Sequence, residues 1–418
     1  MEKERKIYVF ADFLSFHNEL IGTIYVSQIR GKEFYSFAYD QKWLKKGNMM
    51  LDPDLQLYGG RQYINDGKTI FGIFADSCPD RWGRKLMQRR EEIRAKKMDE
   101  KPKKLMESDF LLGVFDEARM GGLRFKIDLD GQFLSSEKEF ATPPWTLLRE
   151  LEQASRAFEN DESGLNEKWL KQLLAPGSSL GGARPKASVM APDDTLWIAK
   201  FPSKHDDFNS GAWEMVVHDL AVMCKLNVPE AKVENFSKLG TTFLVKRFDR
   251  NGKQRIHFSS AMTMLGKKDG ANASDGSSYL EIVSFLKANG ASPQKDLIEL
   301  WKRIVFSMAV SNTDDHFRNH GFLLSDAGWE LSPVYDLNPD VYGEYLSLNV
   351  DEDHAEIDFD LAIEAAPYYG MEKTEAIRIV DSIKSIVKNN WKILAGKYGI
   401  GHGEIERMRP AFQICEKK

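Results

Sequence analysis

The side chains best suited to chemistry lie in one short stretch of the C-terminal half of the sequence. Asp314 is followed five residues later by Asn319, and another carboxylate, Asp336, comes after the next predicted hairpin. Magnesium takes hard oxygen ligands and keeps several waters, so one amide oxygen and one carboxylate can hold it beside the phosphates of a substrate. The spacing therefore predicts that Asn319 and Asp336 bind Mg²⁺ while Asp314 accepts the proton of an attacking hydroxyl group.

This order of residues is the one in which protein kinases supply a catalytic aspartate and two magnesium ligands. Residues 321–335 read as a hairpin turned at residues 326–328, and such a hairpin brings the loops before and after it to one point. One alternative is an acidic patch that is simply solvated. Another is a metal hydrolase, in which zinc or manganese would be bound by His and carboxylate side chains, namely Asp314, Asp315, His316 and His320.

Transfer of a phosphoryl group also needs positive charge on the nucleotide phosphates. Lys200 ends a strand predicted at 195–201, which is where the small lobe of a kinase carries its lysine. Glu214 lies early in a helix predicted from Asn209 and could orient the Lys200 ammonium by pairing with it. The alternatives are a solvated lysine at a strand end and an ordinary surface glutamate.

A loop of small residues at 176–186 is a candidate for anion binding. It is not a P-loop, because Ala183 stands where the lysine of that motif should be. Gly181 and Gly182 would still let backbone amides approach an anion, and Arg184 and Lys186 add positive charge. A plain turn remains the alternative.

The secondary structure that must position these residues is predicted to change from mainly strands to mainly helices along the chain. Branched and aromatic residues at 7–10, 21–26 and 34–39 predict an antiparallel sheet. Beyond residue 277 the pattern is mainly helical, with a last amphipathic helix through 379–394. Further expected elements are helices at 168–174, 279–286 and 297–310 and strands at 123–127, 187–190, 231–233 and 242–245. Strands first and helices after predict an α+β fold of two lobes.

Length and composition set limits on the class of protein. The 418 residues carry 58 Lys and Arg against 63 Asp and Glu, so we expect no non-specific attraction to nucleic acid by the chain alone. Three cysteines far apart fit no disulfide framework, and neither a signal peptide nor a membrane span is expected, which predicts a cytoplasmic protein. Residues 81–104 hold eleven basic and four acidic residues, which suit either a solvated helix or contact with a polyanion or an acidic partner.

Five motifs taken together make this sequence similar to the HipA-type serine/threonine kinases, the toxins of bacterial toxin–antitoxin pairs. The motifs are residues 179–186 (SLGGARPK), 197–200 (WIAK), 245–250 (VKRFDR), 312–319 (NTDDHFRN) and 335–336 (YD). Residues 74–83 and the opening sheet resemble the N-terminal domain of full-length members. The resemblance implies a protein-kinase-like fold with a β-rich N-terminal subdomain at 1–135, the rest of the N-lobe at 136–255 and a helical C-terminal lobe at 256–418.

The resemblance also implies roles for individual residues. Asp314 would be the catalytic base, Asn319 and Asp336 would bind magnesium, and Lys200 would contact the α and β phosphates of ATP. The remaining nucleotide contacts would come from Gly181, Gly182 and Lys186 over the phosphates, and from the hinge Lys246-Arg247-Phe248 beside adenine. Ser179 corresponds to the autophosphorylated serine of the family, with Ser178 left open, and a phosphate there would repel the nucleotide.

Two positions depart from the family pattern. Lys246 stands where an acidic hinge residue is usual, although hinge contacts can be made by the backbone. Asp315 is bulkier than the small residue usual after the catalytic aspartate, which could alter peptide preference.

The resemblance implies a protein substrate, for which an aminoacyl-tRNA synthetase is a candidate, and a small DNA-binding, HipB-like antitoxin as partner. Two other interpretations remain open. One is a small-molecule or lipid kinase, and the other is a degenerate kinase that acts as the binding partner of a repressor.

Overall fold

The structure is a computed structural model, and it describes residues 4–46, 49–64, 67–136, 142–160, 170, 173 and 182–416. Packing divides the chain into two compact units. The first unit comprises Met1–Ala199 and Arg247–Lys268, and the second comprises Lys200–Lys246 and Asp269–Lys418. The predicted divisions near residues 135 and 255 stay predictions, because this division follows packing alone.

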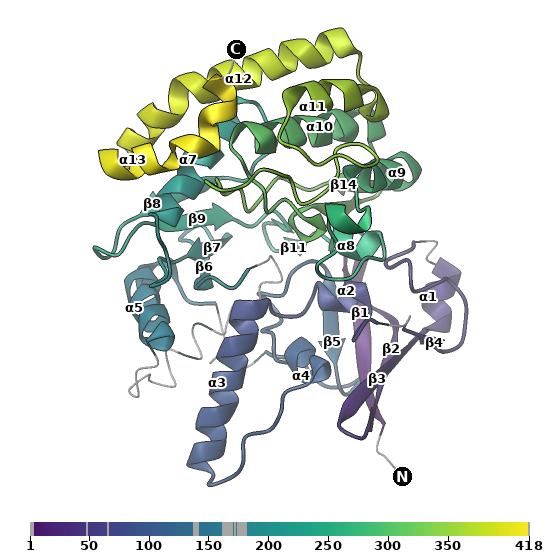
Figure 1. The fold of residues 1–418 in the computed structure, drawn as a ribbon. Helices are drawn as coiled ribbons and strands as arrows, with labels where there is room; N and C mark the ends of the chain where they lie inside the picture. Colours follow the sequence, from purple (N-terminus) through teal and green to yellow (C-terminus); the bar gives the residue numbers. More distant parts are fainter. Residues whose placement is uncertain are drawn as a thin grey trace. The chain divides into compact units, whose positions relative to one another are not determined.

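The first unit is built on a five-stranded antiparallel sheet in the order β4-β3-β2-β1-β5 (Figure 1). Its strands are β1 (Arg5–Phe13), β2 (Phe16–Ile29), β3 (Lys32–Tyr39), β4 (Gln62–Tyr63) and β5 (Leu123–Lys126). Val9, Ile24 and Phe37 are buried on this sheet together with Phe74 and Phe125, because branched and aromatic side chains suit a half-buried pleated surface. The predicted opening sheet is confirmed.

Short helices and strands complete the first unit. The helices are α1 (Gln41–Lys46), α2 (Gly72–Ala75), α3 (Arg81–Lys97), α4 (Glu107–Leu112), η2 (Trp145–Leu147), α5 (Leu148–Glu159) and α8 (Ala261–Met264). The strands are β6 (Lys186–Met190), β7 (Leu196–Lys200), β10 (Arg250–Asn251), β11 (Gln254–Arg255) and β12 (Phe258–Ser260). Asp80 caps α3, because its side chain accepts a hydrogen bond from the Gly83 backbone N–H at 2.8 Å.

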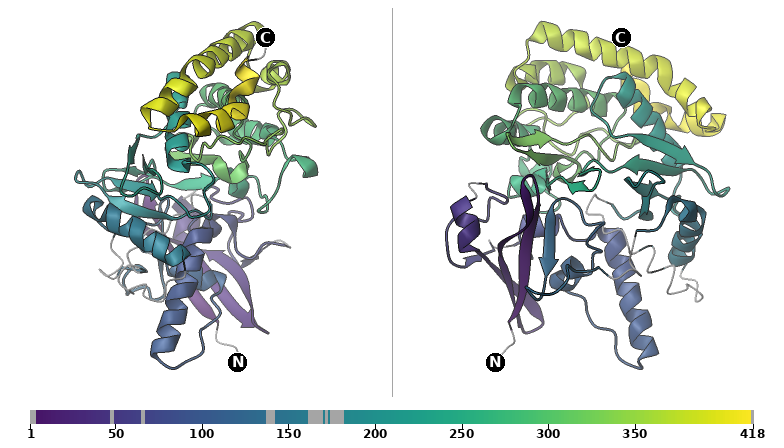
Figure 2. Two further views of the ribbon diagram at one scale, coloured as in Figure 1. Left: turned by 60° about the vertical axis from the view of Figure 1, so that its left-hand side comes forward. Right: turned by 180° about the vertical axis from the view of Figure 1, so that it is seen from behind.

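The second unit is mainly helical (Figures 1 and 2). Its longer helices are α7 (Ser210–Met223), α9 (Tyr279–Asn289), α10 (Pro293–Ala309) and α12 (Lys373–Lys397), and its strands are β8 (Ala231–Glu234), β9 (Thr242–Lys246), β13 (Gly321–Ser325) and β14 (Gly328–Leu331). Its shorter helices are η3 (Ala273–Asp275), η4 (Phe317–Asn319), α11 (Phe359–Ala365), η5 (Ala366–Tyr369), α13 (His402–Met408) and η6 (Arg409–Glu416).

Aromatic residues form the core of this helical unit. Trp391 of α12 stacks on Phe412 with ring centroids 4.5 Å apart, and Trp213 of α7 lies 6.4 Å from Trp391. Trp301 of α10 is fully buried, and its indole N–H donates to the Ala362 carbonyl at 2.8 Å. The aromatic side chains thus join the helices that must hold the neighbouring loops in place.

The structure confirms the predicted α+β class, the hairpin of β13 and β14, and the helix that begins after Asn209. The Asn209 side chain accepts a hydrogen bond from the Ala212 N–H, as expected of a helix cap. The predicted helix at 168–174 lies almost entirely outside the described residues. Within the described ranges, no helix is both long enough and apolar enough to cross a membrane.

Candidate active site

Lys200, the last residue of β7, belongs to the second unit and is held by two carboxylates of the same unit. Its Nζ lies 2.5 Å from Glu214 Oε1 and 2.7 Å from Asp336 Oδ1. Burial alone would lower the pKa of Lys200, but the carboxylates of Asp336 and Glu214 outweigh burial and raise that pKa well above its ordinary value. The predicted pairing of Lys200 with Glu214 is confirmed, and it supplies a permanent cation in a fixed place.

The start of α7 explains how Glu214 reaches this lysine. A Cβ atom on Gly211 would lie 2.0 Å from the Thr241 carbonyl oxygen, so only glycine lets the helix run this close to the backbone that leads into β9. Glu214 follows on the buried side of the helix. The first turns of α7 are therefore fixed by the Asn209 cap and by close backbone packing.

Asn319 is oriented by a hydrogen bond within its own loop. Its Nδ2 donates to the backbone carbonyl of Asp314 at 2.6 Å. Its Oδ1 is buried and accepts no hydrogen bond from the residues that the structure describes. A buried amide oxygen without a donor is costly unless a cation or another group meets it, so this side chain fits the role of a metal ligand.

Asp314 is placed differently from its neighbours. Its side chain is 81% exposed, and its Oδ1 lies 3.6 Å from His316 Nε2. An exposed carboxylate beside an oriented amide can meet a hydroxyl group that arrives from outside the protein.

Asp336 lies in a segment that is tied to the Asp314 loop at several points. The Tyr335 hydroxyl donates to the Arg318 carbonyl at 2.8 Å, and the Asp340 N–H donates to the Ser311 carbonyl at 2.9 Å. Asp336 itself has a φ of 60°, a left-handed conformation that costs energy for a residue with a side chain and often marks functional sites. The segments that carry Asn319 and Asp336 thus adjoin, as the hairpin pattern predicted.

Asp315 points into the protein interior. It is 3% exposed, accepts a hydrogen bond from the Tyr279 hydroxyl at 2.8 Å and lies 3.0 Å from His320 Nε2. Asp315 therefore lies inside the loop, and an effect of its bulk on peptide preference stays a prediction. Among the described residues, no group of three or more His, Cys, Asp or Glu side chains is arranged to hold a metal ion.

Lys186 of the first unit is held by a residue that the sequence did not single out as functional. Its Nζ lies 2.8 Å from Asp80 Oδ2, and both side chains are buried. The indole N–H of Trp82 donates to the Lys186 carbonyl at 3.0 Å. Burial raises the pKa of the Asp80 carboxyl, and the Lys186 ammonium opposes this rise most strongly. Asp80 thus holds the ammonium group of Lys186, and Trp82 holds its backbone carbonyl.

Of the other residues predicted to contact phosphates, Gly182 has a φ of 99°, which favours glycine, and a Cβ atom there would lie 3.3 Å from Lys186 Nζ. Gly181, Ser178 and Ser179 lie outside the described residues. Their predicted roles stay predictions.

The predicted hinge residues contact neighbouring side chains. Lys246 lies 3.5 Å from Glu230, and the Phe248 ring lies 6.0 Å from that of Phe258. Arg247 is buried and donates to both oxygens of Asp249 at 2.8 and 2.6 Å. Its side chain is thereby engaged within the first unit.

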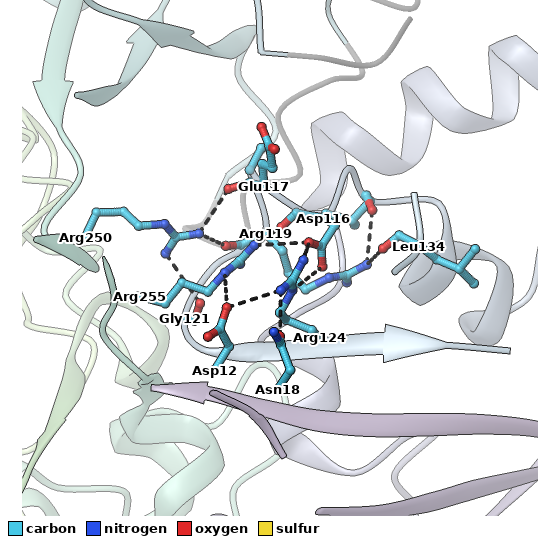
Figure 3. Close-up of polar contacts among 12 residues, drawn as sticks. Asp12, Asn18, Asp116, Glu117, Arg119, Gly121, Arg124, Leu134, Arg250 and Arg255 are labelled. Atoms are coloured by element: carbon cyan, nitrogen blue, oxygen red, sulfur yellow. Dashed lines mark hydrogen bonds and ion pairs between the residues drawn. The ribbon is translucent and has the colours of Figure 1, made fainter. Parts of the chain in front are cut away.

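A buried network of charged side chains anchors the segment that follows the hinge (Figure 3). Arg250 donates to the carbonyls of Glu117 and Arg119 at 3.1 and 2.7 Å. Arg255 lies 3.5 Å from Asp12 and 3.3 Å from Asp116, which also pairs with Arg124 at 2.6 Å. Arg247, Asp249 and Arg250 belong to the motif at residues 245–250, of which only Lys246, Arg247 and Phe248 were predicted to form the hinge.

Two family models match the chain. The HipA-like C-terminal domain matches residues 178–391, which is just over half of the sequence, and the HipA N-terminal domain matches residues 14–102. The chain belongs to the HipA family. The predicted resemblance to a full-length HipA-type protein is thereby confirmed.

A solved structure shows the same fold over the whole HipA-family chain. In the complex of the Shewanella oneidensis MR-1 toxin–antitoxin proteins HipA and HipB with operator DNA, one chain is 17% identical at a TM-score of 0.67, and the match covers 98% of this chain and 96% of that one.

Curated relatives match shorter regions. "Putative kinase Y4dM" of Sinorhizobium fredii is 26% identical over 195 residues, which is 43% of this chain and 42% of that protein. A "Putative kinase" of Haemophilus influenzae is 25% identical over 189 residues, which is 40% of this chain and 54% of that protein. The matches thus span about half the length of these relatives.

Proposed function

We propose that this protein is an ATP- and magnesium-dependent serine/threonine protein kinase of the HipA toxin type. The observation that carries the proposal is the Lys200 ammonium, whose side chain is 13% exposed and which is shared by Glu214 and Asp336. A lysine held by carboxylates in this way is the kind of cation that binds and orients the phosphates of a nucleotide in kinases. The kinase names of the curated relatives agree with it.

Each residue would have a defined part. Lys200 holds the α and β phosphates, Asn319 and Asp336 hold Mg²⁺, and Asp314 accepts the proton of the substrate hydroxyl. The hydroxyl oxygen bonds to the γ phosphorus while the bond from that phosphorus to the β,γ-bridging oxygen breaks, and ADP leaves with the electron pair. The metal ion supplies positive charge to the transferred phosphoryl oxygens.

Gly181, Gly182 and Lys186 would supply further contacts to the phosphates, and Lys246 and Phe248 would contact adenine. Autophosphorylation would occur on Ser179 or on the adjacent Ser178. The substrate is a protein, with an aminoacyl-tRNA synthetase as a candidate, and the partner is a HipB-like antitoxin in the cytoplasm. The solved complex that contains HipB supports this choice of partner.

The proposal is tested by incubation of the purified protein with isotope-labelled ATP and Mg²⁺, with and without a bacterial protein extract, followed by mass spectrometry. Phosphate on a serine or threonine of an extract protein or of the chain itself supports the kinase. Label only in a metabolite or lipid contradicts protein-kinase activity. Tight ATP binding without any transfer contradicts it in favour of a degenerate, partner-binding protein.

Asp80→Asn is expected to weaken ATP binding about tenfold, because Lys186 loses the carboxylate that fixes its ammonium. Isothermal titration with a non-hydrolysable ATP analogue measures the effect. Asp54→Asn is the control, since it breaks a half-buried pair of the first unit, with Lys68 at 2.5 Å, and should leave binding within about twofold. Equal binding by both variants would remove Asp80 from this role.

A further inference from the structure

A chain of hydrogen bonds lies behind the loop that carries Asp314 and Asn319. At one end, the Tyr279 hydroxyl of α9 donates to Asp315 Oδ2 at 2.8 Å, and the Ser307 hydroxyl of α10 donates to the same oxygen at 3.3 Å. Ser307 in turn accepts a hydrogen bond from the Asn312 side chain at 3.2 Å. Two helices therefore hold one buried carboxylate of the loop.

The same chain continues to the second proposed metal ligand. Asn312 Oδ1 accepts a hydrogen bond from the Asn338 backbone N–H at 3.2 Å, and Asn338 Nδ2 donates to Asp336 Oδ1 at 3.2 Å. A path of hydrogen bonds thus runs from Tyr279 to Asp336 through side chains and the Asn338 backbone N–H of the second unit.

Asp315 and His320 connect this path to the candidate catalytic residues, because each directly follows one of them in the sequence. Asp315 directly follows Asp314, and His320 directly follows Asn319. His320 Nε2 lies 3.0 Å from Asp315 Oδ1, and both side chains are buried. The contact therefore closes the loop on its inner side, while Asn319 Nδ2 and the Asp314 carbonyl close it through the 2.6 Å hydrogen bond.

The energetics favour a fixed loop geometry. Burial raises the pKa of the Asp315 carboxyl, but His320 and the Tyr279 hydroxyl outweigh burial and leave that pKa below its ordinary value. The Tyr279 pKa is raised by burial and by Asp315, so Tyr279 stays a donor. A buried charge costs several kcal/mol unless well-oriented partners compensate it. Displacement of the loop would break the hydrogen bonds to Asp315 and is therefore unfavourable.

We propose that Tyr279, Ser307, Asp315 and His320 form a positioning clamp, which sets Asp314 for proton acceptance and holds Asn319 and Asp336 at metal-binding distance from each other. This inference rests on the proposed function and deepens it. None of the four residues needs to touch the nucleotide or the substrate, since they act through the residues beside them. Partners behind the ligands of a metal ion typically change metal affinity 10- to 100-fold when they are removed.

The test uses the full-length protein with Tyr279→Phe, which removes one hydroxyl and keeps the ring. The half-saturating Mn²⁺ concentration in the presence of a non-hydrolysable ATP analogue, followed by electron paramagnetic resonance, should rise about tenfold or more. For autophosphorylation or substrate transfer, kcat should fall about tenfold while KM for ATP stays within about twofold, because Lys200 is untouched.

Tyr369→Phe is the matched control. Tyr369 is as buried as Tyr279, but its hydroxyl donates to the Val350 carbonyl at 3.0 Å. Both variants should lose similar thermal stability, whereas only Tyr279→Phe should change the Mn²⁺ midpoint and kcat. Ser307→Ala, a small change within a helix, provides a second variant should Tyr279→Phe fail to fold.

The outcomes separate the clamp from the proposed function. The clamp is overturned if Tyr279→Phe or Ser307→Ala lowers the melting temperature but keeps the wild-type Mn²⁺ midpoint and kcat. If the wild type binds Mn²⁺ and nucleotide but transfers no phosphate, the kinase proposal fails. The half-saturating Mn²⁺ concentrations of the wild type and Tyr279→Phe still test the clamp in that case. If the wild type binds no metal with nucleotide, both proposals are overturned.

Discussion

Asp314→Asn is expected to lower phosphoryl transfer about 10³-fold or more, because a carboxamide cannot accept the proton of the attacking hydroxyl group. The fold should be retained, since the Asp314 side chain is 81% exposed and changes at exposed sites usually shift stability by about 0.5 kcal/mol or less. The rate of ³²P incorporation into the substrate or the chain measures the loss.

Asp326→Asn is the control for that experiment. Asp326 is an exposed aspartate in the turn between β13 and β14 of the same unit, and it should keep the wild-type rate. Nucleotide affinity should also be unchanged in Asp314→Asn, because Lys200, Asn319 and Asp336 remain. A rate close to wild type in Asp314→Asn would show that another group takes the proton.

Asp249→Asn is expected to destabilise the protein by about 3–5 kcal/mol, the usual effect of breaking a buried ion pair. Asp249 is fully buried, lies 2.6 Å from both Arg247 and Arg250, and accepts a hydrogen bond from the Gly121 N–H at 2.8 Å. Asparagine keeps the size but leaves two buried guanidinium groups without their counter-charge. Urea denaturation at neutral pH measures the change in the free energy of unfolding.

The difference in stability between the wild type and Asp249→Asn is expected to depend on pH. Burial would raise the pKa of Asp249, but Arg247 and Arg250 outweigh burial and hold that pKa well below its ordinary value. The ionised carboxylate therefore stabilises the fold fully above about pH 4, the ordinary carboxyl pKa, and this stabilisation is lost as the pH falls toward the lower folded-state pKa. The difference between wild type and Asp249→Asn should shrink over that range.

Asp130→Asn, at an exposed position of the first unit, should behave like the wild type at every pH. A constant difference between the wild type and Asp249→Asn as the pH falls would contradict a charge-based role for Asp249.

The parts of the fold that the sequence predicted well are set by local patterns. The strands of the opening sheet follow from branched and aromatic residues, and α7 follows from its cap and its helical spacing. The pairing of Lys200 with Glu214 could be predicted because a strand end and the next helix lie close along the chain.

The contacts that the sequence missed join distant segments. Asp80 and Lys186 are more than a hundred residues apart, so no local spacing connects them. The inward direction of the Asp315 side chain was not predicted for another reason. Side chains in an irregular loop follow no period, and its inward direction is decided by Tyr279 and Ser307 on two packed helices.

The structure of the protein with Mn²⁺ and a non-hydrolysable ATP analogue, with the metal located by its anomalous scattering, tests the central claim most directly. We expect one Mn²⁺ ion bound by Asn319 Oδ1, a carboxylate oxygen of Asp336 and nucleotide phosphate oxygens, with Lys200 on the α and β phosphates. A metal ion bound by other groups, or Asn319 and Asp336 directed into separate pockets, would contradict the account.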